Sequence, residues 1–435
     1  MKEIICKLNP SDDFTVPSAF RSINLTEKTD YFYNFWDDQK RKLYQVAEPF
    51  TRSAVDLFNI SLMVYYADRM VLRGNEADGW TRSIKIYMPV LELDIWNGNK
   101  HLLEEMLSFL SGDLWKFEFR TRSLNEIEEK ASKGIQRQRQ KFNPDAICML
   151  SGGLDSFIGA IDLLESSKNV CFVSHYGGGK GVKEYQNQII DKLINEYSLS
   201  AYNFFGFHAA PVKKDKSTPV EQTTRTRSFM FFAHAIILGS GMNKEIKLYI
   251  PENGLISLNV PMNTTRLGSS STRTTHPFYM GRLQELLNNI GLRTTLVNPY
   301  QFKTKGEMIV ECRNHQFLVN HISTTMSCSH PDPRWEGYTS ASHCGTCLPC
   351  VIRRASILKA NVTDQSTYRD PNFQHGHQAQ MELLSYKVGL KDFENDVISH
   401  ELKIQLAGPI KNNISEFAAV YARGMNELKS LIQNY

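Results

Sequence analysis

Six small and polar residues, Ser151-Gly-Gly-Leu-Asp-Ser156, stand between a short apolar run and a helical pattern. The two glycines permit tight backbone turns, which expose amide N–H groups to an anion. The helix that follows adds the partial positive charge of its N-terminus at the same point. This pattern predicts a phosphate-binding loop, and a glycine turn capped by serine is the alternative. The residues expected to bind phosphate are Ser151, Gly152, Gly153, Leu154, Asp155 and Ser156.

The acidic residue of this loop has a different expected role. Asp155 cannot attract phosphate itself, so we expect it to hold Mg²⁺ or to organise the loop. Ser156 offers a hydroxyl donor to a phosphate oxygen. Asp155 and Ser156 are therefore the predicted catalytic residues.

Two further groups of basic residues are candidates for binding an anionic cofactor. Arg225 and Arg227 directly precede an apolar helical stretch, where their charge opposes the helix dipole unless an anion is bound. Arg266 and Arg273 lie in a segment, 266–276, that is rich in hydroxyl residues and contains no acid. Arginine suits phosphate and carboxylate groups because it donates two parallel hydrogen bonds. A polar loop without a ligand is the alternative for the second group.

Half of the eight cysteines gather in one segment with metal-type spacing. The pattern C-x15-C-x2-C-x2-C is formed by Cys328, Cys344, Cys347 and Cys350. Two-residue spacings let successive thiolates converge on one tetrahedral ion, which predicts zinc. A redox-active C-x-x-C pair is the alternative. Because four cysteines would fill all four positions, we expect the metal to be structural rather than catalytic.

The predicted phosphate loop needs a strand before it and a helix after it. Residues 146–150 form an apolar run typical of a buried parallel strand, and 170–174 form a second one. Between them, residues 157–164 have a helical pattern. A strand, a helix and a strand at this length predict an α/β domain with a parallel sheet.

We expect this domain to be flanked by two regions without a recognisable catalytic set. Residues 1–142 are predicted to form an α+β domain with a linker, 143–360 the central α/β domain with the cysteine site, and 361–435 a helical region. The helix expected near the C-terminus carries an apolar stripe from Ile414 to Leu431, which must dock on something.

The overall composition excludes several classes of protein. The 435 residues are 41% hydrophobic and 22% charged, which is ordinary for a globular chain of two or three domains. A formal net charge of +4 is too small to argue for nucleic-acid binding. No apolar run is long enough to cross a membrane, and the N-terminus lacks the pattern of a signal peptide. We therefore expect a cytoplasmic protein without a membrane partner.

The phosphate loop and the cysteine motifs together resemble the QueC family, the 7-cyano-7-deazaguanine synthases of the PP-loop ATP pyrophosphatase superfamily. The motifs are Ser151–Ser156, Met326-Ser-Cys-Ser329 and Cys344-Gly-Thr-Cys-Leu-Pro-Cys-Val-Ile-Arg353. The resemblance covers residues 143–360. It implies a parallel-sheet PP-loop domain, of the adenine nucleotide alpha hydrolase type, with ATP, Mg²⁺ and Zn²⁺ as cofactors.

The family's chemistry implies an ATP-dependent carbon–nitrogen ligase. Family members adenylate the carboxylate of 7-carboxy-7-deazaguanine and let ammonia attack it. In this chain, the long N-terminal region, the helical tail and the segments 251–254 and 266–277 depart from the housekeeping enzymes. The longer plan resembles the QueC-like proteins of anti-phage defence operons, such as the Qat type, which implies a protein partner from the same operon. The regions added at both ends predict in addition a macromolecular amine as acceptor, with the N-terminal unit and the stripe from Ile414 to Leu431 as its docking surface. Packing or oligomerisation elements around an ordinary nitrile synthase are the alternative.

Three other functions stay open at this point. They are an ordinary nitrile synthase that uses ammonia, a tRNA-modifying enzyme, and a scaffold that binds nucleotide without turnover. A tRNA-binding enzyme would need a basic run interleaved with aromatic residues, and the sequence shows none. Intact Asp155 and Ser156 favour an enzyme over a scaffold.

Overall fold

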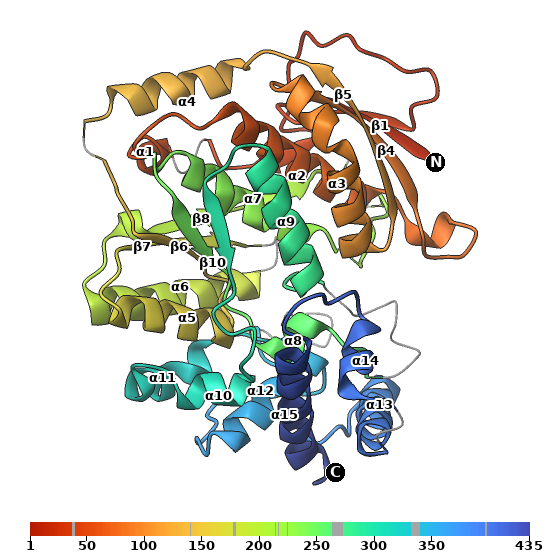
Figure 1. Cartoon of the computed structure of the whole chain (residues 1–435), viewed down its shortest axis with the longest axis vertical. Coiled ribbons are helices and arrows are strands. Elements are labelled where there is room, and N and C mark those ends of the chain that lie inside the picture. Colours follow the sequence, from red (N-terminus) through yellow and green to blue (C-terminus); the bar gives the residue numbers. More distant parts are fainter. Residues whose placement is uncertain are drawn as a thin grey trace.

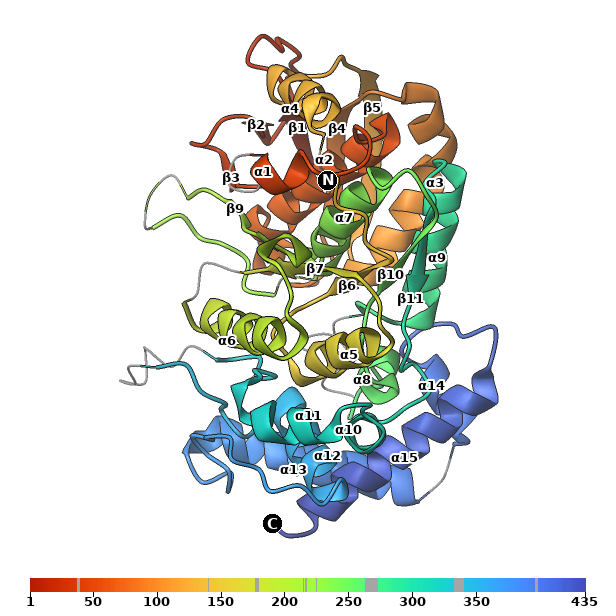
Figure 2. The same ribbon diagram turned by 90° about the vertical axis from the view of Figure 1, so that its left-hand side faces the viewer.

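The computed structural model describes residues 1–36, 40–139, 141–176, 180–213, 215, 217–223, 225–262, 273–331, 340–395 and 398–435. It has three tiers, with an N-terminal unit at one end, a central sheet with its helices in the middle and a helical layer at the other end (Figures 1 and 2). No helix of the described residues combines the length and the apolar character that crossing a membrane requires.

The central tier is built on a sheet of five parallel strands in the order β11-β10-β6-β7-β8. All four residues of β6 are buried, as expected of a strand with neighbours on both sides and helices on both faces. The strands are β6 (Ala146–Met149), β7 (Val170–His175), β8 (Phe204–Phe207), β10 (Ile246–Tyr249) and β11 (Thr294–Val297). The predicted strands at 146–150 and 170–174 are confirmed.

Helices cover both faces of this sheet (Figure 1). The first face carries α5 (Leu154–Glu165) and α6 (Lys180–Tyr197), and the second carries α7 (Arg227–Ser240) and α9 (Pro277–Asn289). When the five strands are numbered by their order in the chain and the sheet is followed from β8 to β11, the strand order is 3-2-1-4-5, which is the doubly wound order. The order reverses between β6 and β10, and ligands of such sheets bind at the carboxyl ends of the strands at this point.

The N-terminal tier is a second parallel sheet, in the order β2-β1-β4-β5. Its elements are β1 (Lys2–Lys7), β2 (Arg21–Asn24), α2 (Arg52–Met70), β4 (Ser83–Val90), α3 (Leu93–Ser111) and β5 (Leu114–Thr121). The expectation of an α+β unit was wrong, because the helices α2 and α3 are crossovers between parallel strands. This region is an α/β unit, followed by α4 (Glu126–Arg137), where a charged helix or linker was predicted.

The two sheets share one apolar core. Helix α2 packs against α7 and α3 packs against α9, so these four helices lie between the sheets. The short strand β3 (Tyr31–Tyr33) pairs with β9 (Ala209–Pro211), which joins the N-terminal chain to the central unit. Nearly every residue of α2 is buried, because it is enclosed by a sheet on one side and by α7 on the other.

The third tier contains the C-terminal helices. They are α8 (Gly254–Leu258), α10 (Lys305–Val310), α11 (His315–His321), α12 (Leu348–Lys359), α13 (Gly376–Glu394), α14 (His400–Gln405) and α15 (Ile414–Ile432), while α1 (Lys40–Leu43) lies in the N-terminal tier. The apolar stripe of α15 is buried against α8, α12, α13 and α14. It packs the fold together, so the idea that this stripe offers a docking surface to an acceptor was wrong.

Candidate active site and metal centre

The predicted phosphate loop connects β6 to α5 at the reversal point of the central sheet. Gly152 has φ +90°, a conformation that favours glycine, and a Cβ there would lie 2.9 Å from Gln186 Cγ. The Gln186 side-chain amide donates to the carbonyls of Ser151 at 3.0 Å and His175 at 3.1 Å. Helix α6 therefore holds the loop in its turned conformation.

The N-terminus of α5 is open to a ligand. Its N-cap residue, Gly153, has no side chain to accept a hydrogen bond, and no other side chain among the described residues caps this helix. Ser156 Oγ donates to the Gly153 carbonyl at 2.9 Å and lies 3.1 Å from Ser151 Oγ. The first-turn amides of a helix point outward along its axis, so those of Leu154 and Asp155 are placed to donate to an anion. Phosphate binding by this loop stays a prediction.

Asp155 joins this loop to the end of β10. Its Oδ2 accepts hydrogen bonds from the backbone of Asn253 at 3.1 Å and from Asn253 Nδ2 at 2.7 Å. Its Oδ1 lies 2.9 Å from Lys305 Nζ, the first residue of α10, and both side chains are more than nine-tenths buried. The loop, the end of β10 and α10 therefore meet at one carboxylate.

A second carboxyl group, that of Glu252, lies beside Asp155 and carries a different charge. Burial alone would raise the pKa of Asp155, but the Lys305 ammonium and hydrogen bonds from Glu252 and Asn253 lower it. Burial, the Asp155 charge and the hydrogen bond to Asp155 raise the pKa of Glu252 well above its usual range. Glu252 thus keeps its proton and donates it to an ionised Asp155.

These contacts favour one of the two expected roles of Asp155, that of organising the loop. The alternative role, holding Mg²⁺, stays a prediction. In the described part of the chain, three or more potential metal ligands gather only at the cysteines. The ionised carboxylate of Asp155 beside the phosphate loop is the group that would hold Mg²⁺, in a site completed by phosphate oxygens and water.

Sequence reasoning missed Lys305 and the tie between Asp155 and Asn253. One local signal was present, since Thr304 and Glu307 form a capping box that begins α10 at Lys305. That signal places the start of a helix, but it does not tell which carboxylate the lysine meets. The meeting depends on β10 lying next to β6, which is a property of the sheet order.

The four predicted cysteines converge, with their sulfur atoms all within 4.8 Å of one another. Cys328 Sγ lies 3.9 Å from Cys347 Sγ, and Cys344 Sγ lies 3.8 Å from Cys350 Sγ. Four thiolates about 2.3 Å from a tetrahedral zinc ion are spaced about 3.8 Å apart. Disulfide sulfurs would be about 2.05 Å apart. The geometry therefore fits a tetrahedral zinc site and does not fit a disulfide.

Backbone amides support these sulfur atoms. The amides of His330 and Cys344 donate to Cys328 Sγ at 3.2 and 3.3 Å, and that of Cys347 donates to Cys344 Sγ at 3.3 Å. Gly345, at φ +93°, makes the turn possible, because a Cβ there would lie 2.7 Å from the Asp370 carbonyl oxygen. Such hydrogen bonds orient the ligands and favour the thiolate form.

The cysteine site is joined to the phosphate loop by the chain that leads into it. The Met326 amide, two residues before Cys328, donates to the Gly152 carbonyl at 2.8 Å. Arg353 is fully buried and donates to Thr325 Oγ1 at 2.5 Å and to the Ile322 carbonyl at 2.7 Å. Arg353 therefore fixes the segment that leads to Met326.

The predicted arginines have separate positions. Arg227 begins α7. It lies close enough to His175, at the end of β7, to affect its pKa, which is lowered first by burial and then by the Arg227 charge. Arg225 and Arg273 contact Trp80 and Phe109 of the N-terminal unit, and the structure shows no contact between them and the phosphate loop. Arg266 lies outside the described residues. The assignment of these arginines to the cofactor stays a prediction.

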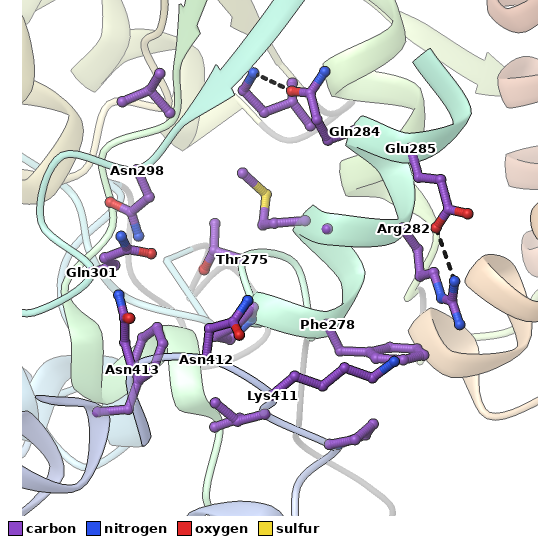
Figure 3. A pocket seen from close by; sticks show the side chains of 18 residues that line it. Thr275, Phe278, Arg282, Gln284, Glu285, Asn298, Gln301, Lys411, Asn412 and Asn413 are labelled. Carbon is purple, nitrogen blue, oxygen red and sulfur yellow. Dashed lines mark hydrogen bonds and ion pairs between the residues drawn. The ribbon is translucent and has the colours of Figure 1, made fainter. Parts of the chain in front are cut away.

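A pocket of about 570 Å³ opens at the end of β11, between α9 and the segment 409–413 (Figure 3). Side-chain amides point into it, including those of Asn298 and Gln301. Asn298 Oδ1 accepts the backbone N–H of Glu252 at 3.3 Å. The pocket therefore borders Glu252, the neighbour of Asp155, and lies on the opposite side of β10 from the phosphate loop.

Comparison with known proteins gives one relative. Over 247 residues the chain is 24% identical to the 7-cyano-7-deazaguanine synthase of Methanococcus vannielii, which is 51% of this chain and 98% of that protein. No protein-family model matches the chain, and no solved structure gives a significant match. The similarity supports the QueC-like character expected from the motifs, and about half of this chain has no counterpart in the relative.

Proposed function

We propose that this protein is an ATP-dependent carbon–nitrogen ligase that activates the carboxylate of 7-carboxy-7-deazaguanine, or of a close relative, and transfers it to an amine. The observation that carries the proposal is the uncapped N-terminus of α5 at the reversal point of the central sheet, tied through Asp155 to Lys305. The similarity to a 7-cyano-7-deazaguanine synthase supports the substrate class.

The proposed reaction has two steps. A carboxylate oxygen of the substrate attacks the α-phosphorus of ATP, the bond to the β-phosphate breaks, and pyrophosphate leaves. The amine then attacks the acyl carbon of the adenylate, loses a proton and expels AMP. Mg²⁺ held beside Asp155 would neutralise part of the phosphate charge.

In this mechanism the phosphate loop binds the leaving pyrophosphate. The amides of Leu154 and Asp155 and the α5 dipole direct partial positive charge to one point. Ser156 serves by fixing the Gly153 carbonyl and meeting the Ser151 hydroxyl. Asp155 positions the loop, since its carboxylate is held by Lys305 and by Asn253.

We propose the pocket beside β11 as the place for the deazaguanine ring system. Its volume is in the range of small-molecule sites, which is roughly 300–1,000 Å³. Side-chain amides such as that of Gln301 match the mixed donors and acceptors on the edge of a purine-like ring. A carboxylate on a ring in this pocket would face the end of β10, towards the phosphate loop.

The acceptor amine is proposed to belong to a partner protein in an anti-phage defence operon. The half of the chain without a counterpart in the relative supports this, because activation needs only the central unit. The N-terminal α/β unit is the remaining candidate for the docking surface, since the α15 stripe is buried. Free ammonia as acceptor, as in an ordinary nitrile synthase, is the competing outcome.

Mass spectrometry of the complete reaction separates these outcomes. The protein is incubated with ATP, 7-carboxy-7-deazaguanine, ammonium and the operon partners, and intact proteins and small molecules are both weighed. A partner that gains the mass of the acyl group supports transfer to protein, and 7-cyano-7-deazaguanine without a mass gain identifies the ammonia-dependent synthase. If the carboxylate is not consumed in the presence of ATP, the proposed ligase activity is wrong.

A further inference from the structure

An excess of buried positive charge lies in the seam between the N-terminal unit and the central unit. Two carboxylates, Asp68 and Asp113, are fully buried there and hold Arg73 and Arg82 in ion pairs of 2.6 to 3.8 Å. These two arginines and two aspartates balance one another. Arg225 and Arg273 add two more guanidinium groups to the same place, and the structure shows no ion pair for either of them.

Arg225 is the clearest case of an unpartnered group. Its side chain is stacked on the Trp80 ring at 4.6 Å, and the residue is only 7% exposed. Its backbone N–H donates to Asp68, but its guanidinium makes no hydrogen bond, and Nη2 is buried. Burial and the charges of Arg73 and Arg273 lower its pKa to about 10. Both effects oppose the charge of Arg225 in the absence of an anion.

Arg273 approaches the same seam from the start of α9. It donates to the Phe109 carbonyl at 2.8 Å and stacks on the Phe109 ring at 4.6 Å, while its Nε is buried without a partner. Burial lowers its pKa as well. Each of the two guanidinium groups is stacked on an aromatic ring and has a buried nitrogen without a hydrogen-bond partner. Guanidinium donors held in this way suit an oxyanion.

A purely structural role explains only some of these arginines. Helix α3 has no basic residue in its last turn, and its terminal carbonyls accept from Arg73 Nη2 at 3.2 Å and from Arg273 Nη1. The helix dipole offers about half a negative charge, and Arg73 and Arg273 already use it. Glu221, at the rim, is engaged by the amides of Arg73 and Thr223. Within the described chain, the Arg225 guanidinium therefore has no ion pair or hydrogen bond of its own, and the nearby carboxylates of Asp68 and Asp113 are already paired with Arg73 and Arg82.

We infer that Arg225 and Arg273 form an oxyanion site in this seam, which takes a phosphate or carboxylate group. Gly112, which ends α3 at φ +76°, lies next to this site, since a Cβ there would be 3.9 Å from Arg225 Nη1. The site stands on contacts with the N-terminal unit and does not depend on the proposed ligase activity. Its ligand is either a nucleotide phosphate that reaches the seam or the acidic group of a second molecule.

Thermal denaturation of the full-length protein tests the site. At equal ionic strength, replacing chloride by inorganic phosphate should raise the Tm by about 2–4 °C. The shift should survive in Gly152→Ala, which alters the phosphate loop, and vanish in Arg225→Met. If Gly152→Ala abolishes the shift and Arg225→Met keeps it, phosphate binds the loop alone, and the seam site is refuted.

The stability of the variants in chloride gives a second, independent readout. Arg225→Met should leave the Tm unchanged or raise it, because it removes an uncompensated buried charge and keeps the apolar stem. Arg73→Met, the matched control, should lower the Tm because it removes the two hydrogen bonds that Arg73 donates to Asp113 and leaves that buried carboxylate with Arg82 alone. If Arg225→Met lowers the Tm as much as Arg73→Met, Arg225 is a structural cation and the inference is wrong.

The same Tm measurement with other anions identifies the group that the site prefers. Acetate in place of phosphate tests for a carboxylate site, and ATP alone tests for a nucleotide that spans the loop and the seam. A shift with any of these three anions that is lost in Arg225→Met supports the oxyanion site and names its preferred group. No shift with any of them in the wild-type protein refutes it.

Discussion

Replacing Lys305 by methionine should destabilise the protein by an amount that depends on pH. In the native protein Lys305 Nζ lies 2.9 Å from Asp155 Oδ1, and the two side chains are only 6% and 8% exposed. Methionine keeps the length and apolar stem of lysine, but it leaves an ionised carboxylate buried beside Glu252. Removing one partner of a buried pair typically costs about 3–5 kcal/mol.

Protonation of Asp155 sets an upper limit on this cost. Without the ammonium, the pKa of Asp155 rises, because burial and the neighbouring carboxyl group are no longer opposed. Taking up a proton at pH 7 costs a carboxyl group of ordinary pKa about 4 kcal/mol, and about 1.4 kcal/mol less for each unit of lower pH. The destabilisation should therefore be about 3–4 kcal/mol at pH 7 and at most about 2 kcal/mol at pH 5.

Urea denaturation at these two pH values measures the effect against matched variants. Lys303→Met is the control on the same segment, because Lys303 pairs with Glu311 at the surface and should contribute less than about 1 kcal/mol. In the double variant Asp155→Asn with Lys305→Met, both charges are gone and most of the stability should return. A Lys305→Met variant as stable as wild type, or strictly additive costs in the double variant, would refute the reasoning.

Three further predictions follow from the site and the core. Elemental analysis should find one zinc ion per chain in the wild type. Cys347→Ser should lose it, whereas Cys312→Ser, buried outside the cluster, should keep it. Zinc retained by Cys347→Ser would contradict this. Gly152→Ala should weaken ATP binding at least tenfold, because φ +90° and the contact with Gln186 exclude a side chain. Gly98→Ala, with open space around it, should bind ATP like the wild type in the same titration calorimetry. Burial lowers the pKa of His234 from 6.5 to about 4, so the unfolded chain takes up a proton that the folded chain excludes, and stability should fall by about 3 kcal/mol between pH 6.5 and pH 4. His234→Phe should remove that part of the slope in urea denaturation, and an unchanged slope would count against it.

The features that could be predicted from the sequence are those fixed by neighbours in the chain. The turn at Gly152 and Gly153, the burial of β6 and the convergence of the cysteines follow from local spacing and residue type. The wrong expectation for the N-terminal region concerns strand direction. The alternation in β5 shows one buried and one exposed face, but it does not reveal that β4 runs parallel to it.

Contacts between residues on different strands could not be predicted either, because local patterns do not give the order of the strands in a sheet. Asp155 and Lys305 are far apart in the chain, and they meet because β10 lies beside β6 and carries Asn253 to the phosphate loop. Arg225 and Arg273 likewise look like loop residues in the sequence, yet they are stacked on Trp80 and Phe109 of the N-terminal unit. Such pairings depend on sheet order and on how the two units pack, which local patterns do not encode.

The most direct test of the proposed function is the identity of the nucleotide products. The purified protein is supplied with ATP, Mg²⁺, 7-carboxy-7-deazaguanine and an amine, and the nucleotides are separated by chromatography while pyrophosphate is quantified. The proposal predicts equal amounts of AMP and pyrophosphate, formed only with the carboxylate present. Asp155→Asn should reduce the rate at least a hundredfold, by analogy with the roughly 10²–10³-fold loss caused by removing one transition-state contact. Formation of ADP and phosphate, or an Asp155→Asn variant with the wild-type rate, would contradict the account.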